Sequence, residues 1–179
     1  MAENKYDSLF VRYGNEFHID PLLLKAQVKQ ESNFNPNAFN KISGAKGLAQ
    51  FMDKTWEEWC DITPGIQREV NKYDPFNPAQ AIHAQSAYMH FLVKLIDQKL
   101  AQTLTDKDYL YHWALAAYNW GIGNILKMLS FSRRRESHDQ YYNYEFAEKY
   151  LPKETANYVQ KIMKYYCEYQ QEEYENAKK

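Results

Sequence analysis

Glu31 is the residue of this sequence whose type and position best suit acid–base chemistry. It lies in a segment of helical periodicity, seven residues after Leu24 and three after Val28, so the three side chains share one helix face. A carboxylate on an apolar face is partly dehydrated, and the unpaired carbonyls of a nearby helix C-terminus disfavour its negative charge. Both effects are expected to raise its pKa from the reference of about 4.3 toward the range of a general acid. From position alone, a solvated glutamate at a helix end is the alternative.

Patterns for metal binding or nucleophilic chemistry are weak elsewhere in the chain. His83 and His90 are seven residues apart, too far for a shared ligand sphere without other groups. Cys60 and Cys167 have no ligand-spaced neighbours, which favours two separate buried thiols, with pairing left open for an oxidising compartment. Gly44–Gly47 lacks the ending of a phosphate loop, and no Gly-x-Ser-x-Gly elbow occurs. We therefore expect no metal and no cofactor.

The element that must position Glu31 is a helix predicted over Pro21–Ser32, with Asp20 as its N-cap. This helix is expected to end before Asn35-Pro36, because the residue preceding a proline is disfavoured in the α region. Similar patterns follow along the chain, and no alternating run is long enough for a confident strand. Further helices are predicted over Tyr6–Phe17, over a segment that begins with a Thr55–Glu58 capping box, and over Pro78–Leu100. The next is predicted over Asp106–Asn119, where Thr105 is the N-cap and Gly121 with Gly123 ends the helix. One or two turns follow over Ile122–Leu129, and a last helix begins at Pro152 and frays from Glu172. The predicted fold class is all-α.

Length and composition bound the class of protein. The 179 residues, 45% hydrophobic and 25% charged, fit one globular domain over 1–179 with a core over about 6–166. A formal charge of -1 argues against nucleic acid as a partner, and the basic run Arg133–Arg135 is expected to be a solvated loop. The longest uncharged stretches are broken by polar residues, so no integral membrane segment is expected. The aromatic content of 16% is expected to serve mostly the core and the helix surfaces, and the remaining rings could line a cleft that binds sugars or peptides.

A series of sequence blocks in order resembles the soluble-lytic-transglycosylase domain family. The blocks are Glu31–Ala38, Gly44–Met52 followed by Thr55, Trp56 and Trp59, Asp74–Pro78 with Ala81 and Ile82, Ala116–Gly121, and Leu151–Thr155 with Tyr158 and Val159. The resemblance covers about Tyr6 to Tyr166 and implies a goose-type-lysozyme-like helical fold with a substrate cleft. It also implies an enzyme that cleaves the β-1,4 bond between N-acetylmuramic acid and N-acetylglucosamine in peptidoglycan, leaving 1,6-anhydro ends.

The resemblance assigns the central role to Glu31. In the family a single glutamate protonates the glycosidic oxygen and then deprotonates the muramic 6-hydroxyl, while the substrate's acetamido group stabilises the developing cation. Such substrate assistance is an exception to the two-carboxylate scheme of glycosidases. Asp61, Asp74 or Glu154 could still lie across the cleft as a second acid.

Other site roles follow from the same resemblance. Gln50 and Met52 match positions that line the saccharide groove, Tyr118 matches a tyrosine that contacts the catalytic glutamate, and Asn119 ties that turn together. Glu154 matches an acidic residue facing the site, with a helix N-terminal charge as the equal alternative.

This chain departs from the family pattern at several positions. It has one residue more than many relatives between Glu31 and Gln50, so the family's substrate-contacting serine corresponds to Asn40 or to Ser43. Trp120 and Ile122 replace a small residue and a proline, which could narrow the groove or add a stacking wall. Asp53 replaces a frequent proline and is expected only to change the cap of the following helix, and Gly44 and Gly47 are attributed to turn geometry and backbone approach.

Two alternatives to a lytic transglycosylase stay open at this point. One is a hydrolytic muramidase of goose-lysozyme type, in which water attacks instead of the 6-hydroxyl, and the other is a non-catalytic wall-binding virion module. The substrate lies outside the cytoplasmic membrane, yet Met1–Gly14 lacks the apolar core of a signal peptide. We expect a monomer that acts on the cell wall or in the periplasm, delivered as a phage-encoded endolysin, as part of a virion, or after removal of a leader.

Overall fold

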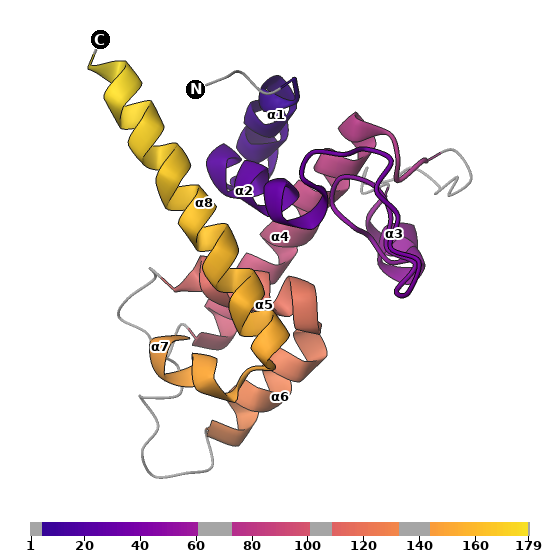
Figure 1. Ribbon diagram of the computed structural model, residues 1–179. Helices are drawn as coiled ribbons and strands as arrows, with labels where there is room; N and C mark the ends of the chain where they lie inside the picture. Colours follow the sequence, from indigo (N-terminus) through magenta and orange to yellow (C-terminus); the bar gives the residue numbers. More distant parts are fainter. Residues whose placement is uncertain (1–4, 61–72, 101–108, 133–143, 179) are drawn as a thin grey trace. The chain divides into compact units, whose positions relative to one another are not determined.

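The computed structural model describes residues 5–60, 73–100, 109–132 and 144–178, and this part of the protein is mostly helical (Figure 1). Its helices are α1 (Asp7–Phe17), α2 (Pro21–Ser32), α3 (Asp53–Trp59), α4 (Pro78–Leu100), α5 (Leu110–Trp120), α6 (Ile122–Ser132), α7 (Tyr144–Ala147) and α8 (Lys153–Ala177), with a 3₁₀ turn, η3, at Glu148–Tyr150. Within these ranges, β pairing is limited to isolated bridges that join Lys46 to Phe39 and to Phe51. The predicted all-α class is confirmed.

The chain divides into two compact units. The first comprises Met1–Tyr88 and Ile162–Lys179, and the second Met89–Lys161. In the first unit α1 packs against α2, and in the second α5 packs against α6 and α7 against η3. The fully buried side chains of the first unit include Phe10, Leu23, Leu24, Leu48 and Ile82, and those of the second include Met89, Leu92, Ile96, Trp113 and Ile125. One domain over 1–179 stays a prediction.

The helices α2 and α4 begin and end at the predicted residues. Asp20 caps α2, because its Oδ1 accepts a hydrogen bond of 2.8 Å from the backbone N–H of Leu22. Asn77 precedes α4 in the same way, and its Oδ1 accepts from the N–H groups of Ala79 at 3.0 Å and Gln80 at 3.2 Å. Both helices start with proline, whose missing N–H costs nothing in a first turn.

The end of α2 has a different cause from the predicted one. Asn33 and Phe34 both adopt left-handed backbone angles, with φ of 50° and 62°, so the helix stops before the proline at position 36 exerts any effect. A positive φ is unusual for a bulky residue such as Phe34. Its ring packs edge-on against Phe10 with centroids 6.5 Å apart, which helps to hold the strained turn. The chain therefore turns sharply directly after the last turn of α2.

Other predicted boundaries were wrong. The helix α3 begins at Asp53, so Thr55 lies inside it, and the N-cap Met52 makes no side-chain cap bond. The capping box fails because Asp53 supplies the favourable negative charge earlier in the chain. The helix α5 begins at Leu110, later than predicted, and the proposed Thr105 cap lies outside the described residues.

Of the helices that follow α5, α6 is longer than predicted. Gly121, with φ of 91°, is the single non-helical residue between α5 and α6. Gly123 lies within α6, which continues to Ser132. The helix α8 runs to Ala177, and its residues beyond Tyr169 are exposed. Fraying from Glu172 stays a prediction. An uninterrupted backbone hydrogen-bond ladder extends α8 past the residues that bury an apolar face.

The structure tests the predictions made for the two cysteines and for membrane-spanning helices. Cys60 and Cys167 are both free thiols, but only Cys60 is buried. The prediction of two buried thiols is wrong for Cys167, because it lies on the solvent face of α8. In the described part of the chain, no helix has the length and apolar character needed to cross a membrane.

The loop between α2 and α3 lies against the segment before α4 at Gly47. This glycine has φ of 73°, and a Cβ on it would come within 1.9 Å of the carbonyl oxygen of Pro75. Gly44 has φ of 79°, yet a Cβ there would meet nothing within 4 Å. As predicted, Gly44 serves turn geometry, whereas Gly47 permits a close approach of two backbone segments.

We predict that Gly47→Ala destabilises the protein by about 2–5 kcal/mol, because it adds a backbone clash to left-handed strain. Gly44→Ala is the matched control and should cost about 1–2 kcal/mol, since strain acts there alone. Urea unfolding followed by circular dichroism measures both. Equal losses of stability would contradict the role given to the Pro75 contact.

Candidate active site

Glu31 lies in the last turn of α2 and is half-buried. Leu24 and Val28, which share its helix face, are completely buried, as the periodicity predicted. A carboxyl group at the edge of a dry face can be shielded from bulk water and still reach a substrate. The strained turn at Asn33 and Phe34 then directs the chain away from the helix axis immediately after it.

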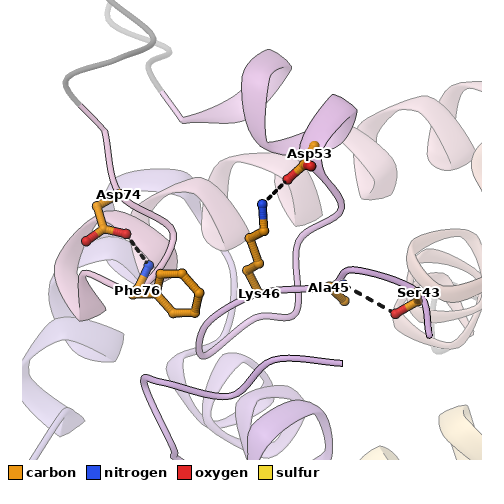
Figure 2. Close-up of polar contacts among 6 residues, drawn as sticks. All are labelled: Ser43, Ala45, Lys46, Asp53, Asp74 and Phe76. Carbon is orange, nitrogen blue, oxygen red and sulfur yellow. Dashed lines mark hydrogen bonds and ion pairs between the residues drawn. The ribbon is translucent and has the colours of Figure 1, made fainter. Parts of the chain in front are cut away.

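The turn that begins at Asn40 distinguishes Asn40 from Ser43. The side-chain Oδ1 of Asn40 accepts from the backbone N–H groups of Ile42 at 2.9 Å and Ser43 at 3.1 Å, which commits it to the turn. Ser43 is exposed, and its Oγ accepts from the N–H of Ala45 at 3.3 Å (Figure 2). A hydroxyl that accepts in this way keeps its proton for donation to another group.

The side chain of Gln50 makes hydrogen bonds to the backbone of its own loop. Its Nε2 donates to the carbonyl oxygens of Gly47 at 3.0 Å and Ala38 at 3.3 Å, while the N–H of Gly47 donates to the same Ala38 oxygen at 2.9 Å. Gln50 itself is half-buried with a left-handed φ of 49°. These bonds leave the side-chain Oε1 to accept from a ligand. The neighbouring Met52 is 47% exposed and offers an apolar surface beside it.

An ion pair that sequence reasoning missed joins the loop to α3. Lys46 donates from Nζ to Oδ1 of Asp53 in the first turn of α3, as Figure 2 shows. Asp53 was expected only to alter the helix cap, and this expectation was wrong because its carboxylate also binds Lys46. Lys46 lies in the loop and Asp53 in a helix, so no periodic pattern in the sequence could have indicated the contact. The pair is largely exposed and contributes about 0–1 kcal/mol.

The segment before α4 is shaped by Asp74. Its Oδ1 accepts from the N–H of Phe76 at 2.9 Å, which closes a turn around Pro75 (Figure 2). This turn presents the Pro75 carbonyl to Gly47. Asp74 is one of the possible second acids, and in the structure its carboxylate accepts a hydrogen bond from the backbone of this turn.

Three further candidate residues lie in the second unit. Tyr118 is half-buried in the last turn of α5, and Glu154 is exposed in the first turn of α8. The exposed Asn119 accepts a 2.8 Å hydrogen bond at Oδ1 from the hydroxyl of Thr155, which is 2% exposed. This contact connects the end of α5 to the start of α8, and the role of Asn119 in its own turn stays a prediction. The predicted contact of Tyr118 with Glu31 involves both units and stays a prediction.

The turn between α5 and α6 carries the two residues that depart from the family pattern. Trp120 and Ile122 are both half-buried on either side of Gly121. The side-chain Nδ2 of Asn124 donates to the carbonyl oxygen of Trp120 at 2.7 Å and fixes the turn. A stacking wall at these positions stays a prediction.

An aromatic pair joins α3 to α4 within the first unit. The rings of Trp59 and Tyr88 lie 5.0 Å apart and inclined at 39°. Burial, and next the carboxylate of Glu58, raises the pKa of Tyr88, so its hydroxyl stays protonated as a hydrogen-bond donor. Among the residues described, no three His, Cys, Asp or Glu side chains gather in a way that could hold a metal ion.

Comparison with known proteins gives concordant results. The family profile described as "Transglycosylase SLT domain" matches residues 8–143. The membrane-bound lytic murein transglycosylase F of Histophilus somni (strain 129Pt) is 32% identical over 122 residues, which are 68% of this chain and 21% of that protein. The chain therefore spans about a fifth of the length of the curated relatives it matches.

Solved structures show the same helical fold. The 70 kDa soluble lytic transglycosylase SLT70 from Escherichia coli has a TM-score of 0.67 and 23% identity, covering 90% of this chain and 23% of that one. A complex of the 70-kDa soluble lytic transglycosylase with bulgecin A has a TM-score of 0.66 and 25% identity, covering 93% of this chain and 24% of that one. The lysozyme-like helical fold that the sequence predicted is confirmed.

We predict that the contact between Asn119 and Thr155 stabilises the protein asymmetrically. Asn119→Ala should cost about 1–3 kcal/mol, because it leaves a buried hydroxyl without its partner. Thr155→Val should cost about 1 kcal/mol or less, because the exposed Asn119 can bond to water instead. Urea unfolding of both variants and of the double variant measures the coupling. Strictly additive losses would show that the two side chains do not act together.

Proposed function

Because the chain belongs to the transglycosylase SLT domain family, we propose that it cleaves the glycan strands of peptidoglycan as a lytic transglycosylase. The proposed bond is the β-1,4 link between N-acetylmuramic acid and N-acetylglucosamine, and the proposed product carries a 1,6-anhydro ring. The observation that carries the proposal is the place of Glu31, half-buried at the end of a dry helix face. The loop with Ser43, Gln50 and Met52 follows it directly in the chain.

In the proposed reaction the carboxyl group of Glu31 acts twice. It first gives its proton to the glycosidic oxygen, and the bond from that oxygen to C1 of the muramic residue breaks. The carbonyl oxygen of the substrate's own acetamido group stabilises the positive charge at C1. The carboxylate then takes the proton of the 6-hydroxyl, whose oxygen bonds to C1. Glu31 ends protonated, as it began, and no water is consumed.

The loop residues supply substrate contacts in this proposal. Ser43 is preferred to Asn40 as the contact for the acetamido group, because its hydroxyl can still donate whereas Oδ1 of Asn40 is held by the turn. Gln50 would accept from a sugar hydroxyl or amide through Oε1, since Nε2 already braces the loop. Met52 would pack against the apolar face of a sugar ring.

The residues of the second unit take supporting roles. Tyr118 is proposed to orient the Glu31 carboxyl group, and Asn119 to hold the α5 end that carries Tyr118, through its bond to Thr155. Glu154, exposed at the start of α8, is proposed to face the substrate, while a favourable charge at a helix N-terminus would also account for it.

The proposed partner is the peptidoglycan polymer, with the cell wall as the place of action. The hydrolytic muramidase is not favoured, because the matching relatives are named as transglycosylases. A monomeric state, a phage origin and delivery with a lysis system are proposals that rest only on the resemblance in sequence. The non-catalytic wall-binding module is disfavoured by the half-buried Glu31 on its dry face.

We predict that Glu31→Gln lowers the release of soluble muropeptides by roughly 10²–10⁴-fold, since the amide keeps the shape of the side chain but cannot transfer the proton. Liquid chromatography with mass spectrometry of a peptidoglycan digest measures the release, and sedimentation with insoluble peptidoglycan shows that binding persists. Glu168→Gln, an exposed change on α8, should keep the wild-type rate. Near-normal turnover by the Glu31 variant would refute the assignment.

We also predict that Tyr118→Phe lowers kcat by roughly 10-fold, the equivalent of one orienting hydrogen bond, with little change in KM or in the unfolding midpoint. Steady-state release of labelled muropeptides measures the kinetics, and thermal unfolding provides the control. A variant with the wild-type kcat would mean that Tyr118 serves packing only.

A further inference from the structure

Two glutamines lie in the dry core of the first unit, one on α2 and one on α4. Gln27 and Gln85 are both 0% exposed, although glutamine is found mostly on protein surfaces. The Nε2 group of Gln85 donates to the carbonyl oxygen of Leu24 at 3.2 Å and to Oε1 of Gln27 at 2.8 Å. Both acceptors belong to α2, so one amide of α4 holds that helix at two points.

The direction of these bonds follows from chemistry. The backbone oxygen of Leu24 can only accept, so the atom of Gln85 that faces it must be nitrogen. The same nitrogen reaches Gln27, whose oxygen therefore points toward α4. The remaining atom, Oε1 of Gln85, is buried without a hydrogen-bond partner among the described residues. An apolar side chain of similar length would fill this space without burying the unpaired Oε1 of residue 85, so packing alone does not account for Gln85.

The pair acts on the helix face that carries Glu31. Gln27 precedes Glu31 by one helical turn, at the i, i+4 spacing that places two side chains together on a surface. Leu23 and Val28 make apolar contacts that set no direction, and a further polar contact of α2, from Nζ of Lys25 to Asp7 at 2.9 Å, lies nearer its start. Hydrogen bonds are directional and break when a helix rotates or slides. The two amides therefore restrict the rotation and the axial shift of α2 in the half of the helix that carries Glu31.

We propose that Gln85 and Gln27 are positioning residues for the transglycosylase reaction, which hold α2 in the register that presents the Glu31 carboxyl group to the glycosidic oxygen. This inference rests on the proposed function. A misplacement of about 1 Å at a reacting group can lower the rate by roughly 100-fold. The proposal predicts a catalytic defect that is separate from any loss of stability.

The test compares Gln85→Met, Gln27→Met and the double variant, all apolar and of similar length. Each single variant should lower kcat by roughly 10–100-fold with KM within about twofold of the wild type. The double variant removes both polar groups, so its unfolding midpoint should recover toward the wild type. Its kcat should stay low. Recovery of kcat together with stability would show that the pair serves only stability and would overturn the proposal.

Matched variants keep the test decisive. Ser86→Ala changes the neighbouring buried residue, whose hydroxyl bonds within α4 to Ile82, and should keep the wild-type kcat. If Gln85→Met does not fold, Gln85→Asn keeps an amide with a shorter reach, and a wild-type kcat in that variant would overturn the proposal. A wild-type protein that does not cleave peptidoglycan refutes the proposed function, whereas a cleaving wild type with fully active variants refutes only the positioning role.

Discussion

The arrangement of the candidate site depends on the close approach of Gly47 to the carbonyl oxygen of Pro75. Only a residue without a side chain allows the loop after α2 to lie against this segment. The bonds from Gly47 and Gln50 to the oxygen of Ala38 then close the loop on itself. The proposed substrate contacts of the first unit all belong to this loop. A glycine that takes no part in the chemistry therefore sets where the chemistry can occur.

The second requirement is that α2 itself be held firmly, and the structure holds it along its length. At its start, Asp20 accepts from the N–H of Leu22 at 2.8 Å and from the hydroxyl of Tyr166 on α8 at 2.6 Å. In its middle, Gln85 binds α2 from α4. Glu31 thus lies in the last turn of a helix that is anchored at its start and in its middle. A preorganised acid requires such a rigid support.

Features set by a few neighbouring residues could be predicted from the sequence. The starts of α2 and α4 follow from Asp20, Asn77 and the proline after each of them, and the turn at Gly44 follows from the freedom of glycine to adopt a positive φ. Features that depend on distant packing could not. The bond from Gln85 to Gln27 joins positions 58 residues apart, and neither the exposure of Cys167 nor the length of α8 has a local sequence signal.

The origin of the oxygen in the product tests the central claim most directly. Peptidoglycan can be digested with the wild-type protein in water enriched in the heavy oxygen isotope, and the released muropeptides weighed by mass spectrometry. If Glu31 directs the 6-hydroxyl to C1, the products lack one water relative to reducing ends and carry no heavy oxygen. Incorporation of heavy oxygen at C1 would contradict the account, because it would show that water attacks.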